Sequence, residues 1–149
     1  MRAVLQRVTR AEVRVDGRVV GRIGPGLLVL LGIGKRDTPA SGDSLAEKIV
    51  NLRVFDDDRG RMNRSILETG GELLCVSQFT LYGDCRKGRR PSYDQAAAAA
   101  VAESLYGSFL QSLRAYGNKV ESGIFRAMMQ VELVNNGPVT LLLDTEGLF

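Results

Sequence analysis

Two hydroxyl side chains and one amide lie within an otherwise apolar stretch of the sequence, LLCVSQFTLY, which spans residues 73–82. Ser77 and Thr80 are residue types that can attack an ester, and Gln78 can orient a substrate by hydrogen bonding. As a strand, the segment would place Gln78 and Thr80 on one face and Ser77 on the other. An attacking hydroxyl commonly passes its proton to a histidine, and this chain contains no histidine. A reaction at this strand therefore needs help from another group.

A glycine and a proline near the end of the chain form a second group of chemical interest. Gly137 has no side chain and Pro138 has no N–H, so the pair exposes mainly carbonyl oxygens, which can accept hydrogen bonds from an ammonium group. Proline also interrupts a sheet, so the simplest interpretation is an ordinary trans turn over residues 135–138 between two strands. From the residues alone, both interpretations stay open.

Four cationic side chains crowd into one short segment, namely Arg86, Lys87, Arg89 and Arg90. Runs of charge are usually solvated surface loops. This one lies directly before a predicted helix start, and a basic loop beside a helix N-terminus is a suitable platform for phosphate. The net charge of +3 permits a nucleic-acid partner without requiring one. Spacing alone leaves nucleic-acid binding and a solvated loop equally open.

The acidic and sulfur-containing residues predict neither a metal site nor a cofactor. The aspartates at 56–58 lack the alternating ligands and the distal glutamate of a calcium loop, and Gly60 after them favours a solvated hairpin turn. Cys75 stands between apolar residues and is predicted to lie in the core, whereas Cys85 is predicted to be more exposed. Without a disulfide framework or a secretion signal, we expect a cytoplasmic protein with reduced thiols.

Length and composition fit one globular domain over residues 1–149. Hydrophobic residues make up 44% of the chain and charged residues 25%, as in ordinary globular proteins. The longest apolar run, residues 27–33, is far too short for a membrane span, so we expect no membrane partner.

The order of patterns predicts a mixed α/β fold. Asp16 and Gly17 between two apolar runs predict a hairpin, and residues 27–33 predict a central strand covered on both faces. Thr38 and Pro39 are typical of a helix start. Further predicted elements are a strand over 73–82, a helix over 94–116 with a capping box from Ser92 to Gln95, and strands over 128–134 and 139–143. We expect a single domain with curled, barrel-like sheets and two main helices packed outside.

With these segments assembled, the chain resembles the D-aminoacyl-tRNA deacylases, also called D-tyrosyl-tRNA deacylases, over essentially its full length. The matching segments are MRAVLQRVTRA (1–11), GLLVLLG (26–32), SQFTL (77–81), RRPS (89–92) and NGPVT (136–140). Two separated motifs, SQFT and NGPVT, make the resemblance specific. Tyr93 stands where phenylalanine is common in the family, and this departure lies outside both motifs.

The resemblance implies an ester hydrolase that removes D-amino acids from aminoacylated tRNA and acts as a homodimer. It also implies that the bond between Gly137 and Pro138 is cis. Each subunit would insert this loop into the active site of the other, where the two residues form a chirality gate. Their carbonyl oxygens would hold the α-ammonium of the substrate, and the rigid main chain would exclude an L side chain by collision.

The family's catalytic positions map onto Ser77, Gln78, Phe79 and Thr80. Thr80 would be the nucleophile or a positioning group, and the N–H of Phe79 or Thr80 would stabilise the oxyanion. Ser77 and Gln78 would orient the ester. Because no side-chain base is evident, we favour the version in which a hydroxyl of the terminal ribose helps to activate water.

The resemblance also assigns binding positions. Phe125 and Met129, in GIFRAMMQ (123–130), match family positions that could line an adenine pocket, although core packing explains them equally well. The four cations of the basic segment would contact the tRNA backbone. Two other functions stay open: a related editing deacylase with altered chirality for small amino acids, and a noncatalytic RNA-binding dimer.

Overall fold

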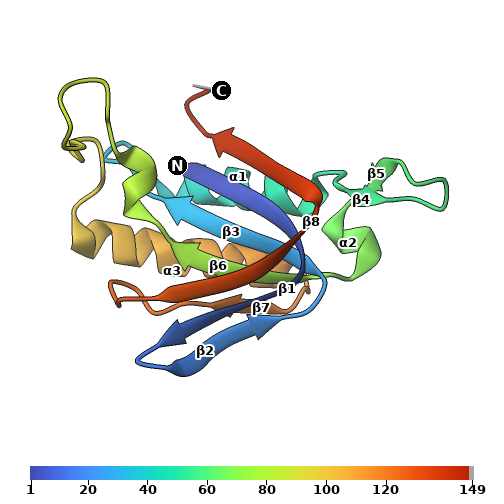
Figure 1. Ribbon diagram of the computed structural model, residues 1–149. Coiled ribbons are helices and arrows are strands. Elements are labelled where there is room, and N and C mark those ends of the chain that lie inside the picture. The colour runs from blue at the N-terminus through green and yellow to red at the C-terminus, as the bar shows by residue number, and fades with distance from the viewer. Residues whose placement is uncertain (148–149) are drawn as a thin grey trace.

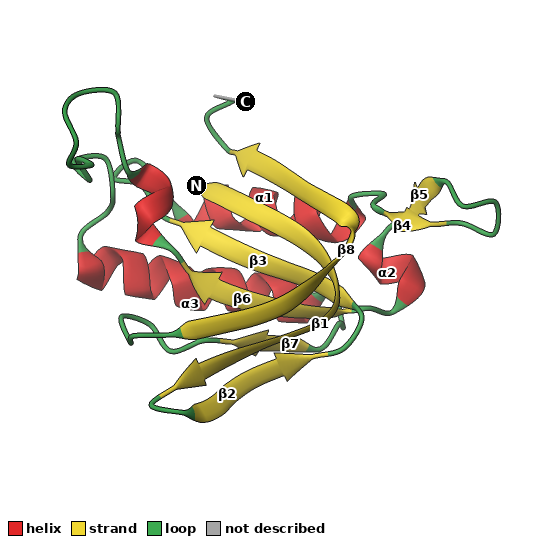
Figure 2. Ribbon diagram, in the orientation of Figure 1, coloured by secondary structure: helices red, strands yellow, loops and turns green. Residues whose placement is uncertain are grey.

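The chain folds as a strongly curled sheet with its two long helices against one face (Figures 1 and 2). The structure is a computed structural model that describes residues 1–147. In chain order the elements are β1 (Arg2–Val15), β2 (Arg18–Ile23), β3 (Gly26–Gly32), α1 (Pro39–Asn51), β4 (Phe55–Asp56), β5 (Met62–Arg64), α2 (Ile66–Thr69), β6 (Glu72–Ser77), the 3₁₀ helix η1 (Phe79–Tyr82), α3 (Ala99–Ala115), β7 (Val120–Ser122) and β8 (Gln130–Asp144).

Strand β1 organises the sheet because it is long enough to pair with three other strands. Its first half pairs with β3, its second half pairs with β2, and β8 pairs along both halves, all in antiparallel orientation. Strands β6 and β7 continue the sheet beyond β3 in parallel orientation. The change of partners along β1 goes with the curl that Figure 1 shows. The prediction of a mixed α/β domain with a barrel-like sheet and two main helices outside is confirmed.

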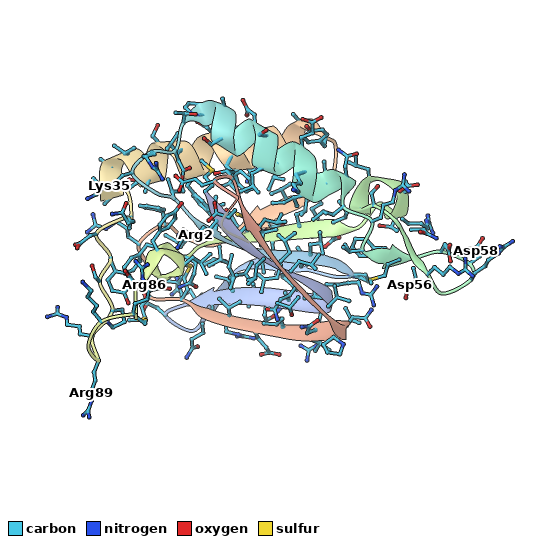
Figure 3. The ribbon with its side chains drawn as sticks, turned by 90° about the horizontal axis from the view of Figure 1, so that it is seen from above. Arg2, Lys35, Asp56, Asp58, Arg86 and Arg89 are labelled. Atoms are coloured by element: carbon cyan, nitrogen blue, oxygen red, sulfur yellow. The ribbon has the colours of Figure 1, made fainter. Side chains whose placement is uncertain are left out.

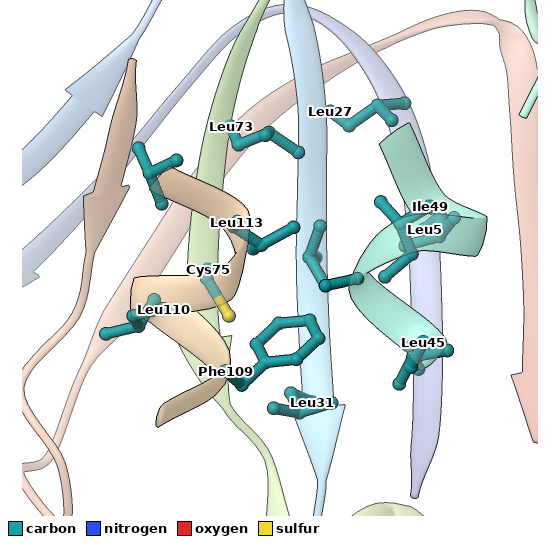
Figure 4. Packing of buried hydrophobic residues seen from close by; sticks show 14 of the residues in the cluster. Leu5, Leu27, Leu31, Leu45, Ile49, Leu73, Cys75, Phe109, Leu110 and Leu113 are labelled. Carbon is teal, nitrogen blue, oxygen red and sulfur yellow. The ribbon is translucent and has the colours of Figure 1, made fainter. Parts of the chain in front are cut away.

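Apolar residues fill both sides of the central strands. Figure 4 shows the first cluster, in which Leu31 and Cys75 from the sheet meet Ile49 of α1 and Phe109 of α3. The second cluster lies on the opposite face of the sheet and includes Leu28, Leu74 and Val76 with side chains of β1, β2 and β8. Strand β3 is therefore covered on both faces, as its unbroken apolar run predicts.

Local residue chemistry explains two predicted boundaries. Asp16 and Gly17 both have positive φ angles, 48° and 76°, as the tight turn between β1 and β2 requires. Thr38 caps α1, because its hydroxyl accepts a hydrogen bond from the Ser41 N–H at 3.3 Å, and Pro39 follows as the first helical residue. Both predictions are confirmed.

The predicted strand over residues 73–82 is wrong in its second half. Strand β6 ends at Ser77, and residues Phe79–Tyr82 form η1. The neighbouring strand β3 ends at Gly32, and the last link between the two is a hydrogen bond from the Gln78 N–H to the Leu31 carbonyl at 2.7 Å. Beyond this point the chain has no strand to pair with, so the predicted alternation of side chains across Gln78 and Thr80 does not apply.

The predicted start of the second long helix is also wrong. Helix α3 begins at Ala99 and not at residue 94, and Ala98 before it provides no side-chain cap. Ser92 does not cap a helix, because its main chain pairs with Asp84 in an isolated β-bridge. Among the helices of residues 1–147, none is long and apolar enough to cross a membrane.

The predicted turn between two final strands is a bulge within one strand. Strand β8 runs continuously from Gln130 to Asp144. In its pairing with β1, Asn135 lies opposite Val8 and Thr140 lies opposite Gln6, so residues 136–139 all face the single position of Arg7. The bulge accommodates the proline without ending the strand. Proline lacks an N–H, and none is needed where the pairing of the strands is interrupted.

Candidate functional site

A cavity of about 680 Å³ opens where β6 passes into η1. Four stretches of chain enclose it: the end of β3, the end of β6 with the start of η1, the approach to α3 with its first turn, and the segment that leads into β8. Its lining residues include Ser77, Gln78, Phe79, Phe125 and Met129. The structure thus brings together five of the residues that the sequence singled out, from two distant parts of the chain.

Thr80 stands beside the cavity without lining it. Its side chain is exposed, and its hydroxyl oxygen accepts a short hydrogen bond from the side-chain amide of Gln78. Gln78 in turn is fixed by its own N–H, which bonds to the Leu31 carbonyl. The amide therefore holds the Thr80 hydroxyl in place.

The start of η1 presents main-chain donors at the mouth of the cavity. The first N–H groups of a helix have no acceptor within it, which here concerns Phe79 and Thr80. Gln78, which precedes the helix, makes no capping bond with its side chain. Phe79 is 59% exposed, and its ring packs against that of Tyr93, with 5.0 Å between ring centroids. These N–H groups can donate hydrogen bonds to an anionic oxygen beside Phe79.

The apolar wall of the cavity is continuous with the core. Phe125 packs against Tyr106, with 5.9 Å between ring centroids, and the Tyr106 hydroxyl donates to the Cys75 carbonyl at 2.8 Å. Met129 packs against the second core cluster. Phe125 and Met129 therefore both line the cavity and pack against the core, and the core supports this wall of the cavity.

Acid–base groups are scarce at this site. Among the described residues that line the cavity there is no carboxylate, and the sequence has no histidine. Cys75 lies below the wall, but burial raises the pKa of its thiol to about 12, so it carries no thiolate at neutral pH. The prediction that Cys75 is a core residue is confirmed.

The bulge of β8 is a second candidate functional feature, and its residues do not line the cavity. The peptide bond between Gly137 and Pro138 is cis, and neither residue lines the cavity of its own chain. The Asn135 side chain spans the bulge, because its amide donates to the Thr140 hydroxyl and its oxygen accepts from the Val139 N–H, both at 3.0 Å.

Arg7, on the neighbouring strand β1, binds the main chain of this bulge. The sequence analysis did not single out Arg7. Its guanidinium donates to the carbonyl oxygens of Asn136 and Val54 and to the carboxylate of Asp56. Only 8% of Arg7 is exposed. The sequence carried no distinctive signal for it, because β1 also holds arginines at positions 2, 10 and 14.

The basic segment projects from the body (Figure 3) and contributes no residue to the cavity lining. Figure 3 shows Arg89 pointing into solvent, while Asp56 and Asp58 lie on the hairpin at the opposite end. Arg86 is held by Asp84, with Nε 2.9 Å from Oδ1 and Nη2 2.6 Å from Oδ2, and this pairing keeps the pKa of the Asp84 carboxyl well below its usual range. Because α3 starts only at Ala99, the segment does not adjoin a helix N-terminus as predicted.

Metal-binding residues do not gather anywhere in residues 1–147. No group of three or more cysteine, aspartate or glutamate side chains in this range is arranged to hold an ion. In the β4–β5 hairpin, Asp57 instead accepts bonds from the main chain of Arg59 and Arg61 and from the Asn63 amide, which lowers the pKa of its carboxyl. Asp57 thus stabilises the hairpin turn, whereas the Asp56 carboxylate accepts a hydrogen bond from Arg7.

Comparisons with known proteins point in one direction. The family described as D-Tyr-tRNA(Tyr) deacylase matches residues 4–144. The chain is 60% identical to the D-aminoacyl-tRNA deacylase of Thermosipho africanus (strain TCF52B), over 100% of both chains. It is 59% identical to the enzyme of the same name from Symbiobacterium thermophilum, over 100% of this chain and 99% of that one.

Two solved structures share the fold. The c-Myc DNA Unwinding Element Binding Protein superposes with a TM-score of 0.91 at 44% identity, over 97% of this chain and 98% of that one. A probable eukaryotic D-amino acid tRNA deacylase superposes with a TM-score of 0.82 over 95% of this chain and 97% of that one. At 21% identity, the second likeness concerns the fold alone.

Proposed function

Since this chain belongs to the D-Tyr-tRNA(Tyr) deacylase family, we propose that it hydrolyses the ester bond of D-aminoacyl-tRNA and releases the free D-amino acid and tRNA. The observation that carries the proposal is the cavity beside η1. It combines an apolar wall, which suits a nucleobase, with main-chain donors at the start of the helix, which suit the carbonyl of an ester.

The terminal adenosine enters against Phe125 and Met129. An aromatic ring and a polarizable thioether are suitable neighbours for a flat purine. This placement brings the esterified ribose toward Ser77 and Gln78, which line the same cavity and orient the ester. Because the wall is backed by the core, it holds the base in one position.

The ester carbonyl lies at the start of η1. Attack on it creates negative charge on the oxygen, and the N–H groups of Phe79 and Thr80 stabilise that charge. Each such donor contributes about 3–4 kcal/mol to the transition state. The donors belong to the main chain, so this contribution does not depend on the identity of the Thr80 side chain.

Water is the attacking group, and the substrate helps to activate it. No carboxylate lies among the described lining residues and the chain has no histidine, so the protein offers no evident base. The ribose hydroxyl next to the ester is close to the reacting carbon in every aminoacyl-tRNA. Thr80, held by Gln78, positions the substrate and does not attack it.

Chirality is read by a second copy of the chain in a homodimer. Gly137 and Pro138 lie outside the cavity of their own chain and protrude from β8 as a bulge. Inserted into the partner's cavity, their carbonyl oxygens accept hydrogen bonds from the α-ammonium, and the main chain collides with an L side chain. The rejection needs no contact with a D side chain, so many D-amino acids are accepted, and glycine is accepted in part.

Side-by-side hydrolysis of D-tyrosyl-, L-tyrosyl- and glycyl-tRNA tests this function. We expect fast release of D-tyrosine, partial release of glycine and little release of L-tyrosine, by a cytoplasmic enzyme without an added cofactor. Equal hydrolysis of the D and L substrates would exclude the chirality gate. Release of glycine or L-alanine in preference to D-tyrosine would instead favour a related editing deacylase.

A noncatalytic RNA-binding dimer is the second candidate. The exposed cations Lys87, Arg89 and Arg90 favour it, because they suit a phosphate backbone whether or not an ester is cleaved. Persistent affinity for tRNA with no turnover of any aminoacyl ester would select this function over the first.

A further inference from the structure

Arg126 occupies a backbone position that suits glycine. The Ala127 N–H bonds to the Ile124 carbonyl at 3.2 Å, which closes a four-residue turn with Arg126 in third place. Its φ angle is +65°, in the left-handed region that residues with a Cβ adopt at a cost. The turn itself therefore gives no reason for an arginine.

The fold makes no use of the Arg126 charge. Within residues 1–147 its guanidinium takes part in no ion pair, whereas Arg2, Arg7 and Arg10 each contact a carboxylate. The residue is exposed, so its charge is not neutralised by burial either. A cation that stabilises neither the turn nor the core is available for a ligand.

The positive charge of Arg126 lies at the cavity. Arg126 lines it, and it is the one ionisable side chain among the described lining residues. Its chain neighbours on the same wall are the aromatic Phe125 and the thioethers of Met128 and Met129. The site thus combines an apolar wall with a single positive charge, which fits a ligand that joins a flat base to an anion.

We propose that Arg126 binds the phosphate that links the terminal adenosine of the substrate to the preceding nucleotide. The inference rests on the proposed function, because it takes the base bound at Phe125 and Met129 as the terminal adenine of tRNA. The same turn then places Phe125 against the base and Arg126 beside the phosphate. A guanidinium forms two parallel, charge-assisted hydrogen bonds with phosphate oxygens, so the contact fixes orientation as well as adding affinity.

Kinetics of Arg126→Gly and Arg126→Lys provide the test. For D-tyrosyl-tRNA we expect the KM of Arg126→Gly to rise about tenfold, with kcat changed less than twofold and with partial recovery in Arg126→Lys. With D-tyrosyl-adenosine, which has no phosphate, the wild type and both variants should have equal KM. Arg59→Gly is the matched control, since it removes an exposed arginine from the β4–β5 hairpin and should leave both substrates unaffected.

A second measurement separates this inference from the proposed function. Calorimetry with adenosine and adenosine 5′-monophosphate as probes should show tighter binding of the monophosphate to the wild type and equal binding of both to Arg126→Gly. The melting temperature of Arg126→Gly should equal or exceed that of the wild type, because glycine suits the turn.

Three results would overturn the role of Arg126. They are an unchanged KM for D-tyrosyl-tRNA in Arg126→Gly, an equal loss with D-tyrosyl-adenosine, and the absence of any preference of the wild type for the monophosphate. A wild type that binds the monophosphate through Arg126 but cleaves no D-aminoacyl ester would refute the proposed function alone.

Discussion

The guanidinium of Arg7 holds the main-chain carbonyl of Asn136, with 2.9 Å between Nε and the oxygen. The same side chain donates from Nη1 to the Val54 carbonyl at 2.8 Å and to an oxygen of Asp56 at 3.2 Å. A nearly buried charge is tolerated only when such partners surround it. One arginine thus fastens the bulge that carries the proposed chirality gate to the strands beneath it.

Replacing Arg7 should loosen the bulge and the whole fold together. Arg7→Met keeps much of the volume but leaves two carbonyls without their donor, so we expect a loss of about 2–4 kcal/mol in the free energy of unfolding. The ratio of D- to L-tyrosyl-tRNA hydrolysis should fall at least about tenfold, or about 1.4 kcal/mol. Urea unfolding and paired hydrolysis assays measure the two effects.

The control for this change lies on the same strand. Arg10 forms an exposed ion pair with Glu132 at 2.8 Å, with both side chains more than half exposed. Such pairs contribute little, so Arg10→Met should cost under about 1 kcal/mol and leave the D to L ratio unchanged. An Arg7→Met variant that behaves like Arg10→Met would refute the anchoring role.

A methyl group at Gly137 should damage the bulge by collision. An added Cβ would lie 2.8 Å from the Val139 side chain and 3.1 Å from the Arg7 guanidinium, and the φ of +135° disfavours any residue with a Cβ. We expect Gly137→Ala to lower the free energy of unfolding by about 1–3 kcal/mol and to reduce deacylation. Chemical denaturation and initial rates test this.

The matched glycine for comparison is Gly107, in the interior of α3. A Cβ there would meet no atom within 4 Å, and alanine is the better helix former. Gly107→Ala should therefore raise the free energy of unfolding by about 0.5–1 kcal/mol and leave activity unchanged. Equal behaviour of the two variants would show that the space around Gly137 is not critical.

Sequence patterns predicted the elements whose signals are local. The turn at Asp16 and Gly17 and the cap at Thr38 depend on neighbouring residues alone, and the burial of Cys75 follows from its apolar flanks. The signal for α2 is equally local, a capping box of Ser65 and Glu68, but the sequence analysis did not use it and the helix was missed.

The predictions that were wrong depend on contacts with other segments of the chain. Strand β6 ends at Ser77 because its neighbour β3 ends beside it, and no residue of β6 itself indicates this end. The role of Arg7 depends on carbonyls that come from β8 and from the segment before β4. Strand β7 is short and pairs in parallel with β6, so its few residues carry no alternation that identifies it. The candidate site was thus predicted from its motifs, whereas its geometry required the fold.

Removing the Thr80 hydroxyl should have a modest effect. The hydroxyl is exposed, accepts a bond from Gln78 and does not line the cavity, so we expect Thr80→Ala to keep kcat within about tenfold of the wild type. A tRNA ending in 2′-deoxyadenosine should instead lose almost all turnover. Single-turnover rates decide the matter: an inactive Thr80→Ala variant, together with a wild type that still cleaves the deoxy substrate, would make Thr80 the nucleophile.

Burial of Cys75 should make stability fall in alkaline solution. Burial raises the pKa of this thiol to about 12, whereas in an unfolded chain its pKa is about 8.5. Between these values the unfolded chain releases the proton and the native chain keeps it. The contribution is complete below about pH 8.5 and is lost as the pH rises toward 12, with a slope of up to about 1.4 kcal/mol per pH unit.

Urea unfolding between pH 8 and 10 measures this slope. Cys75→Ala should be less stable than the wild type at pH 8, because it leaves space in the core, but its stability should decline less steeply with pH. Cys85→Ala, at an exposed position, should follow the wild type. Parallel curves for the wild type and Cys75→Ala would mean that the buried thiol does not contribute to the alkaline loss.

Cations of the basic segment should differ in their contribution to tRNA affinity. Asp84 already neutralises much of the Arg86 charge, whereas Arg89 and Arg90 form no ion pair with the described residues. We therefore expect Arg89→Gln with Arg90→Gln to weaken tRNA binding more than Arg86→Gln does. Each lost phosphate contact should reduce the slope of log K against log salt by about 0.7–0.9.

Binding measured across a salt series separates these charges from the site of reaction. The double variant should converge with the wild type at high salt, and its D to L ratio should stay constant, because the segment does not line the cavity. A change in chirality preference would instead place the segment in contact with the aminoacyl group. A salt slope equal to that of the wild type would exclude Arg89 and Arg90 from the tRNA interface, and the affinity would then depend on the cavity alone.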